Sequence, residues 1–333
     1  MLPMVSVFWV NYNSMHVIDI IKESLNALMS LDYPYYELVI VDNGSTDGSR
    51  EVVKEHVKKL QKNMNASRVC IIKLDRNSGF AGGANIAYRN RDLASKYVTI
   101  VNNDAIPCND YLKKLVPFME SHEDVGAVQG IVLKRGSDQK VDSAGLFVDE
   151  FINTYAPFID KSASMFSIPF HVSYIEGTMP LYRVDAIVRS LKNNDTIYVT
   201  AGFMYFLEDV FLSLMLWNSG YRCVVLPVIV GEHYRKATLN KFARHVGLSY
   251  YSFRNRIALL EMTNNKRKRM VFLSLITRLA LSRRSYRMRK ELLRAMVDGI
   301  CLGKYLKEKY GVIDLEKVPL IRTSIRRYIT LRF

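Results

Sequence analysis

The segment Tyr97-Val-Thr-Ile-Val-Asn-Asn-Asp104 changes abruptly from apolar to polar. Its apolar part has the composition of a buried parallel strand, and its last three side chains form a polar cluster. Ligands of open α/β sheets bind at the carboxyl ends of the strands, so the cluster with Asp104 is a candidate binding site. We expect Pro107 to stop the strand from continuing. An ordinary Asn/Asp turn explains this segment equally well, and only its neighbours distinguish the two interpretations.

Strands and helices alternate on the N-terminal side of this segment. Strands are predicted at Val5–Val10, Glu37–Val41 and Val69–Leu74, and helices at Ile18–Leu31, Arg50–Lys62 and Ile86–Ala94. Each strand ends in a polar loop, and helical crossovers of this length join parallel strands. The predicted fold class is therefore α/β, with a Rossmann-like, mostly parallel central sheet flanked by helices.

The pattern becomes less regular after a helix predicted at Asp110–Ser121. Strands are expected at Val125–Leu133 and Gly145–Val148, whereas Phe151–Ser173 has no clear period and is expected to be a mobile loop. The later elements are predicted to be two helices, the second amphipathic, and two extended runs: Val184–Leu191, Leu207–Gly220, Tyr221–Leu226 and Pro227–His233. The rest is predicted to be helical, over Val246–Met262, Arg269–Arg283 and Ser285–Tyr310. We therefore expect an α/β domain, residues 1–240, and a basic helical C-terminal region, residues 241–333.

Charge is distributed unevenly along the 333 residues. The whole chain has 47 Lys+Arg and 32 Asp+Glu, a net charge of +15. Residues 234–333 hold 25 of the basic and 6 of the acidic side chains, which leaves 22 and 26 for residues 1–233. A nearly neutral body with a strongly basic tail favours contact with an anionic surface such as phospholipid, nucleic acid or an acidic partner.

Two glycine-containing clusters follow predicted strands. The first, Asp42-Asn-Gly-Ser-Thr-Asp-Gly-Ser49, offers a carboxylate that can accept from a nucleotide base or ribose; the alternative is a turn that caps the next helix. The second, Gly79-Phe-Ala-Gly-Gly-Ala-Asn85, opens a helix whose backbone N–H groups suit phosphate. Arg76 precedes it and could pair with a diphosphate. The second cluster is neither a P-loop nor the dinucleotide-binding fingerprint, so it is weak evidence alone.

Two further candidates lie later in the chain. Glu208 and Asp209 begin the predicted amphipathic helix, where one carboxylate could face a site while the other supports it. A carboxylate beside an incoming hydroxyl could act as a general base, although acidic residues also occur at helix starts for electrostatic reasons alone. His233 ends an apolar extended run and could complete a metal site with Asp104, or be a purely structural histidine.

Taken in order, these pieces resemble a family-2 glycosyltransferase with the GT-A fold, over about Val5 to Arg256. The matching pieces are Val-Asn-Tyr-Asn after the first strand, Val-Asp-Asn-Gly-Ser-Thr-Asp-Gly, Asn-Ser-Gly-Phe-Ala-Gly-Gly-Ala-Asn, Asn-Asn-Asp, Glu-Asp-Val, Gly-Tyr-Arg and the late His. The ordered series is specific, whereas no single piece is. The chain looks closest to the rhamnosyltransferase-like and galactofuranosyltransferase-like branch, which carries Asn-Gly-Ser-x-Asp and Phe-x-Gly-Gly-x-Asn.

The resemblance implies a role for each matching residue. Asp104 would be the metal-binding carboxylate of the family's DxD element and His233 a further ligand, while Asp209 would be the catalytic base with Glu208 beside it. The donor sugar nucleotide would contact Asn11, Asn13, Asp42, Arg76, Asn77, Gly79, Asn85 and Asn103. The first Asp of DxD is Asn102 here, so the donor diphosphate would supply more of the oxygens around Mg²⁺ or Mn²⁺.

The implied reaction is an inverting transfer of a sugar from a nucleotide diphosphate, with dTDP- or UDP-sugars favoured. The acceptor would be a hydroxyl of a glycan or of a lipid-linked molecule. Rival interpretations are a catalytically weak sugar-nucleotide-binding protein and a nucleic-acid-binding protein; the second lacks a recognisable reader motif, so no nucleic acid is expected.

The basic tail suggests where the reaction would occur. Lys266-Arg-Lys-Arg269 precedes the short apolar run from Met270, and Arg283 and Arg284 follow that run. This arrangement suits an anionic membrane surface, although the same helices could pack on the catalytic domain or a second subunit and make a homodimer. Four scattered cysteines indicate reduced thiols. We expect a cytoplasmic protein, peripheral on the cytoplasmic face of the membrane.

Overall fold

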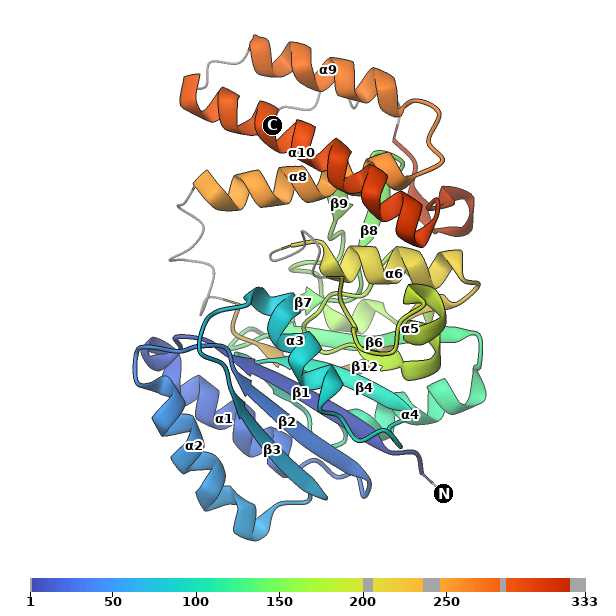
Figure 1. The fold of residues 1–333 in the computed structure, drawn as a ribbon. Coiled ribbons are helices and arrows are strands. Elements are labelled where there is room, and N and C mark those ends of the chain that lie inside the picture. The colour runs from blue at the N-terminus through green and yellow to red at the C-terminus, as the bar shows by residue number, and fades with distance from the viewer. Residues whose placement is uncertain (1, 200–205, 236–245, 282–285, 324–333) are drawn as a thin grey trace.

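The computed structural model describes residues 2–199, 206–235, 246–281 and 286–323. Its centre is a mixed sheet of ten described strands in the order β10-β12-β6-β11-β4-β1-β2-β3, with β5 added to β12 and β7 to β6 (Figure 1). The parallel half consists of β1 (Val5–Asn11), β2 (Tyr36–Asp42), β3 (Arg68–Lys73) and β4 (Tyr97–Asn102). The predicted α/β class with a mostly parallel sheet is confirmed.

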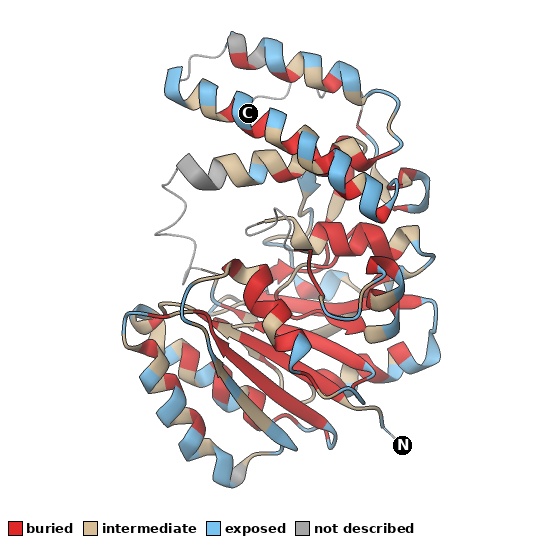
Figure 2. Ribbon diagram, in the orientation of Figure 1, coloured by how far each residue is buried: buried red, intermediate tan, exposed pale blue. Residues whose placement is uncertain are grey.

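Helices cover both faces of the parallel half. Alternation along β1 sends Val7 and Trp9 to one face and Phe8 to the other, and all three are fully buried. The first face packs under α1 (Ile18–Met29), α2 (Ser49–Leu60) and α4 (Tyr111–Ser121), and the second under α3 (Gly79–Arg89). Figure 2 shows β1, β2 and β4 buried along their length. The apolar runs between polar loops therefore form strands that are buried on both faces, as the sequence predicts.

Helix α3 begins seven residues earlier than predicted, because the glycine-rich cluster forms its first two turns instead of a loop before it. A Cβ added to Gly83 would lie 2.8 Å from Cγ1 of Val10 on β1. Glycine therefore lets this helix approach the sheet closely. The polar ends of β1 and β2 and the start of α3 are brought to the same edge.

Strand β4 ends at Asn102, and Asp104 lies in the turn that follows it. The chain then forms a second short strand, β5 (Ala105–Pro107), which pairs antiparallel with β12 and sets Ala105 opposite His233. Pro107 thus ends β5 and not β4, which corrects the expectation. This pairing places the end of β12 beside Asp104, although the two are far apart in the sequence.

The other half of the sheet is mixed. Strand β11 (Leu181–Arg183) lies antiparallel between β4 and β6 (Val125–Lys134), and β12 (Arg222–His233) runs parallel to β6. The two predicted extended runs from Tyr221 form this one strand, with three register shifts along it. Helix α5 (Val184–Leu191) has its predicted bounds.

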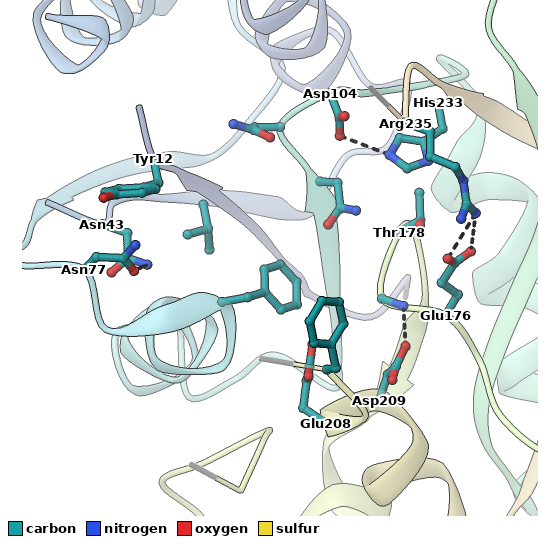
Figure 3. Close-up of a pocket in the computed structure, with 16 residues that line it drawn as sticks. Tyr12, Asn43, Asn77, Asp104, Glu176, Thr178, Glu208, Asp209, His233 and Arg235 are labelled. Atoms are coloured by element: carbon teal, nitrogen blue, oxygen red, sulfur yellow. Dashed lines mark hydrogen bonds and ion pairs between the residues drawn. The ribbon is translucent and has the colours of Figure 1, made fainter. Parts of the chain in front are cut away.

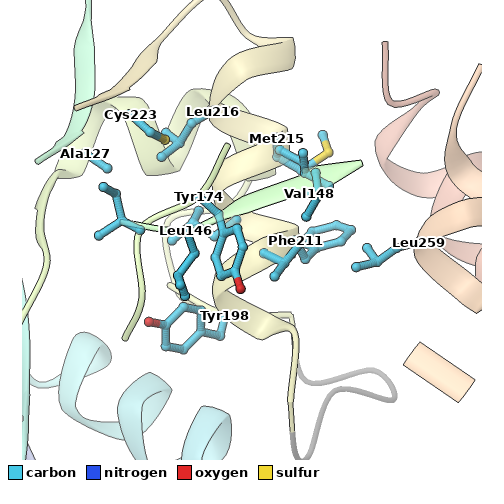
Figure 4. Packing of buried hydrophobic residues seen from close by; sticks show 14 of the residues in the cluster. Ala127, Leu146, Val148, Tyr174, Tyr198, Phe211, Met215, Leu216, Cys223 and Leu259 are labelled. Carbon is cyan, nitrogen blue, oxygen red and sulfur yellow. The ribbon is translucent and has the colours of Figure 1, made fainter. Parts of the chain in front are cut away.

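Helix α6 (Glu208–Asn218) is not amphipathic, contrary to prediction. Every residue from Val210 to Leu216 is buried, because the sheet lies on one side and the C-terminal helices on the other. The ring of Phe211 meets that of Tyr310 at 5.4 Å between centroids. Figure 4 shows Leu259 of the C-terminal region beside Phe211 and Val148. Because α6 is packed on both sides, its first turn, which begins at Glu208, is held in a fixed position.

The predicted loop Phe151–Ser173 contains short elements. It holds β9 (Thr154–Tyr155), a 3-10 helix (Ala163–Met165) and β10 (Phe170–His171), which joins the main sheet beside β12. Rings of Phe158, Phe166 and Phe170 stack or meet edge to face, with centroids 5.1–5.5 Å apart. The segment is therefore packed on the body through aromatic contacts that its lack of periodicity concealed. Strand β9 pairs with β8 (Phe147–Asp149), while β7 (Val141–Ser143) pairs with β6.

The described residues after β12 include the helices α8 (Val246–Met262), α9 (Lys268–Ala280) and α10 (Tyr286–Tyr310). Helices α8 and α10 pack closely, and α9 lies outermost (Figure 1). The chain then returns to the body through β13 (Leu320–Ile321), which pairs with β8. In the part of the chain that the structure describes, no helix is long and apolar enough to cross a membrane. The predicted boundary at residue 240 and the basic residues Arg283 and Arg284 lie outside the described residues.

Candidate active site

A pocket of about 330 Å³ opens at the carboxyl edge of the parallel strands (Figure 3). It collects side chains from the ends of β1, β2, β4 and β12, from the start of α3 and from the start of α6. Asp104 and Asp209, separated by a hundred residues in the sequence, both line it. The sequence prediction that these two acidic groups meet in one cleft agrees with this geometry.

The first half of the pocket is built around His233. Its Nε2 donates to Oδ1 of Asp104 at 3.0 Å, and its Nδ1 donates to Oδ2 of Asp142 at 2.8 Å. All three side chains are at most 7% exposed. Burial alone would lower the pKa of His233, but the hydrogen bonds and charges of the two carboxylates outweigh it and raise the pKa to about 9. The imidazole is therefore held in one orientation.

These residues fit a divalent cation in part. Asp104 and His233 line the pocket, whereas Asp142 lies behind the ring and orients it, as carboxylates commonly do for metal-bound histidines. Among the described residues, no group of three or more His, Cys, Asp and Glu side chains could hold a metal by itself. A cation here would need further oxygens from a bound ligand, which suits an ion that binds together with a diphosphate.

The second half of the pocket is the first turn of α6. The positive φ of Leu207, 67°, turns the chain sharply into the helix, so both acidic side chains enter the pocket. Asp209 accepts from the backbone N–H of Gly177 at 3.3 Å and of Val210 at 2.8 Å. Oε2 of Glu208 has no partner within the described residues.

Both acids have raised pKa values. Burial raises the pKa of Asp209 to about 7, and the negative charge of Glu176 adds to this. Burial also raises the pKa of Glu208 to about 8, with Asp209 as the second cause. A carboxylate with a pKa near neutrality can accept a proton and release it again, which is the requirement for a general base.

Asp42 and Asn11 lie beneath the pocket and do not line it. Oδ1 of Asp42 accepts from Nδ2 of Asn11 at 3.1 Å, and its Oδ2 accepts from the backbone N–H of Ser45 at 3.1 Å. Asn13, at φ 47°, accepts from the backbone N–H of Thr46 at 2.8 Å. These predicted donor contacts thus hold the turn after β2 in place.

Asn43, in the turn after β2, lines the pocket. Its Nδ2 donates to Asn77 Oδ1 at 3.1 Å and to the carbonyl of Gly79 at 3.0 Å, and its Oδ1 accepts from the backbone N–H of Ser78 at 3.0 Å. Gly44 next to it has φ 78°, and a Cβ there would lie 2.6 Å from the backbone carbon of Arg76. The two loops after β2 and β3 are therefore joined.

The remaining predicted donor residues differ in position. Asn77 and Asn103 line the pocket, whereas Arg76, Gly79 and Asn85 do not. Asn85 is 1% exposed and holds the segment at residues 197–198, donating to the carbonyl of Tyr198 at 2.7 Å and accepting from the N–H groups of Ile197 and Tyr198. Its position favours a structural contribution.

Sequence reasoning missed several lining residues: Tyr12, Asn43, Phe80, Glu176, Phe206 and Arg235. Tyr12 and Asn43 stand next to residues that were selected, so a wider window around each motif would have included them. Arg235 is two residues after His233, and a charged side chain just after an apolar strand is a signal that could have been used. Phe80 lies within the glycine-rich cluster that the sequence singled out, whereas Glu176 and Phe206 have no signal in the sequence.

Comparisons with known proteins bear on the family to which the chain belongs. The model of the family described as "Glycosyl transferase family 2" matches residues 6–191. A stretch of 117 residues is 30% identical to the putative teichuronic acid biosynthesis glycosyltransferase TuaG of Bacillus subtilis, covering 35% of this chain and 42% of the relative. A second relative, an uncharacterized glycosyltransferase of Haemophilus influenzae, is 29% identical over 38% of this chain and 36% of its own length. The chain thus spans about two fifths of the length of these curated relatives.

A longer match and a solved structure extend the comparison. A dolichyl N-acetyl-alpha-D-glucosaminyl phosphate 3-beta-D-2,3-diacetamido-2,3-dideoxy-beta-D-glucuronosyltransferase of Methanococcus voltae is 24% identical over 69% of this chain and 67% of the relative. The crystal structure of S. aureus TarS superposes with a TM-score of 0.55 and 19% identity, over 90% of this chain and 49% of that one. The latter shows a shared fold alone. Because the family model covers more than half of the sequence, the chain belongs to glycosyl transferase family 2 and has the GT-A type of fold.

Proposed function

We propose that this protein is an inverting glycosyltransferase that moves a sugar from a nucleotide diphosphate to a hydroxyl of a glycan or lipid-linked acceptor. The observation that carries the proposal is the two-sided pocket. Figure 3 shows Asp104 and His233 on one side of it and Glu208 and Asp209 on the other. Direct displacement requires this separation, because the leaving diphosphate and the attacking oxygen lie on opposite faces of the sugar.

Asp209 has the role of base in this proposal. It takes the proton of the acceptor hydroxyl while that oxygen bonds to the anomeric carbon and the bond from that carbon to the diphosphate breaks. The backbone N–H of Gly177 fixes the carboxylate, and Glu208, with the higher pKa, stays protonated beside it at neutral pH. Removing a positioned general base costs roughly 10²–10⁴-fold in rate.

Asp104 and His233 would hold Mg²⁺ or Mn²⁺, with Asp142 orienting the imidazole. For this role Nε2 of His233 would have to be deprotonated, and it would then no longer donate to Asp104. The bound ion would neutralise charge on the diphosphate. The lining supports this requirement: with Glu208 protonated and His233 neutral as a ligand, the acids Asp104, Glu176 and Asp209 outnumber Arg235, the remaining cation among the described lining residues. A dianionic donor would otherwise meet like charge. The amides of Asn43, Asn77 and Asn103 and the ring of Tyr12 form the rest of the proposed donor surface.

The decisive experiment has two parts. Thermal unfolding with UDP-, dTDP- and GDP-sugars, each with and without Mn²⁺ or Mg²⁺, should identify the donor as the one that raises the Tm only together with metal. Turnover of that donor by Asp209→Asn should fall at least 10²-fold while its metal-dependent stabilisation remains. If Asp209→Asn turned over the donor at the wild-type rate, Asp209 would not be the general base. A product that retains the anomeric configuration of the donor would contradict the proposed inverting mechanism.

We also propose that the C-terminal helices bind an anionic membrane surface, which would bring the pocket to a lipid-linked acceptor. Helix α9 has apolar side chains on two faces. Val271, Leu275 and Leu279 are buried, whereas Met270, Leu273 and Ile276 on its other face are 58%, 65% and 41% exposed. The exposed cations Lys266, Arg267 and Arg269 stand at the start of this helix. Apolar side chains flanked by cations favour the interface of an anionic bilayer.

Leu273→Glu tests this surface. Co-sedimentation with vesicles of phosphatidylserine and phosphatidylcholine at low salt should fall at least tenfold in the variant, because a carboxylate would enter the interface. Leu93→Glu is the matched control, since Leu93 is 83% exposed on a different part of the molecule. Equal vesicle binding by both variants and the wild type would contradict the proposal, and a concentration-dependent dimer lost only in Leu273→Glu would assign this face to a second copy of the chain.

A further inference from the structure

The segment Tyr174–Thr178 joins the two halves of the pocket. At one end, the carbonyl of Thr178 accepts from the backbone N–H of Asn102 at 3.2 Å, where β4 ends before Asp104. At the other, the N–H of Ile175 donates to Oγ of Ser213 at 3.2 Å and the N–H of Gly177 donates to Asp209 at 3.3 Å. Asp209 and Ser213 are one turn apart on α6. The segment is therefore tied both to the strand before Asp104 and to the helix of Asp209.

Glu176, at the middle of this segment, is held by Arg235. Nη2 of Arg235 donates to both carboxylate oxygens of Glu176 at 3.1 Å, and its Nε donates to Oδ1 of Asp142 at 2.8 Å. Asp142 in turn accepts from His233. A planar guanidinium with two carboxylate partners fixes both of them. Figure 3 shows this pair beside the loop that reaches Asp209.

The charge of Glu176 acts on Asp209. After burial, it is the main reason that the pKa of Asp209 is raised. The other titratable groups near Asp209 are those whose own pKa values its charge raises: Glu208 on its own helix, Tyr174 in the segment, Tyr182 on β11 and Tyr198. Burial raises the pKa values of the three tyrosines, so they are neutral at working pH, and Glu208 is mostly protonated. Glu176 is therefore the principal charge that Asp209 meets among the described residues.

We propose that Glu176, clamped by Arg235, is a positioning residue that holds the segment on which Asp209 is fixed and keeps a negative charge near this carboxylate. The inference rests on the proposed function, because it needs Asp209 to be the base. Glu176 precedes Gly177, whose N–H donates to Asp209, and its charge acts on Asp209 at a distance. Arg235 ties Glu176 to Asp142, which holds His233. The two ends of the active site are thereby coupled through one ion pair.

The test is an infrared titration of the Asp209 carboxyl group in metal-free protein that carries ¹³C-labelled aspartate. The band is assigned by its absence in Asp209→Asn, and no substrate is needed. In Glu176→Gln the midpoint should move down by roughly one pH unit, because a like charge is lost. In Arg235→Gln it should move up, because the charge of Glu176 is no longer compensated. Glu232→Gln is the control: it removes one carboxylate that faces Arg135, and no shift is expected.

Opposite shifts in the two variants are the signature of the proposal, since general loosening of the pocket would move both midpoints in the same direction. The same midpoint in Glu176→Gln and the wild type would overturn it, as would two shifts of the same sign. Should Glu176→Gln fail to fold, Glu176→Asp keeps the charge and should leave the midpoint within a few tenths of a unit while lowering kcat. Full turnover in Asp209→Asn would instead contradict the proposed function, a result separate from the infrared midpoints.

Discussion

Single buried side chains determine much of how this pocket behaves, and Asp209 is the clearest case. Its ordinary pKa is 3.8, and in the folded protein it is about 7. The folded state therefore binds the proton more tightly than the unfolded state. Stability from this group is full below pH 4 and declines as the pH rises through 7. The proposed base is thus kept at a cost in stability at neutral and alkaline pH.

Asp209→Asn should consequently be more stable than the wild type at pH 8, by about 1–3 kcal/mol, because the buried charge is removed. At pH 4 the two proteins should unfold at similar urea concentrations. Urea unfolding at both pH values checks this, with Glu232→Gln as a control at an ion-paired surface position. A variant less stable than the wild type at pH 8 would show that the carboxylate is stabilised by contacts that outweigh its burial.

Asn85 gives a prediction about a residue that the sequence assigned to the donor pocket. Its buried amide makes three hydrogen bonds to the backbone at residues 197–198. Asn85→Ala should therefore cost about 2–3 kcal/mol of unfolding free energy, because buried backbone groups lose their partners. The donor KM should change little. Denaturant unfolding and steady-state kinetics measure the two effects, and a large rise in KM at unchanged stability would restore the donor role.

At the scale of elements, the sequence predicts regular structure well where a run of apolar residues lies between polar loops. The strands β1, β2 and β4 and helix α5 have nearly or fully the expected bounds, because local pattern and burial agree there. Predictions of element bounds and burial failed where contacts between segments distant in the sequence determine the structure. The glycine-rich cluster joins α3 because Gly83 meets Val10, and α6 is enclosed by helices that lie far along the chain.

The site divides in the same way. Asp104, Glu208, Asp209 and His233 could be selected because each is a polar group at the end of a strand or the start of a helix. Glu176 could not be selected, and Arg235 only by its nearness to His233. Their roles depend on the ion pair between them, 59 residues apart in the sequence, and on the hydrogen bond from Gly177 to Asp209. Spacing within one motif carries no information about such contacts.

Helices α8 and α10 provide a prediction at this scale. A Cβ at Gly303 would lie 2.5 Å from the carbonyl oxygen of Ala258 and 2.7 Å from Cβ of Glu261. Gly303→Ala should separate the helices and cost about 1–3 kcal/mol, more than the higher helix propensity of alanine returns. Cys301→Ala, at an exposed position on the same helix, is the control and should be nearly neutral. Equal thermal stability of the two variants would contradict this packing.

For the whole molecule, one hydrophobic core includes residues of both predicted regions. Leu259 on α8 is fully buried in the same cluster as Phe211 and Val148 of the catalytic part. We therefore expect a single cooperative thermal transition. Leu259→Ala should lower its midpoint, with a cost of about 2–5 kcal/mol for the cavity, while Leu273→Ala at an exposed site should not. Calorimetry checks this, and two transitions with only one shifted would show that the regions unfold independently.

The short pairing between β5 and β12 has a consequence for biosynthesis. Asp104 emerges from the ribosome long before His233, and their side chains meet only when the later strand docks along Ala105–Pro107. A nascent chain that stops short of β12 already contains the parallel half of the sheet, but it lacks half of the proposed metal site. Affinity for metal and sugar nucleotide should therefore appear abruptly during translation, as a sign that the last strand of the sheet has been made.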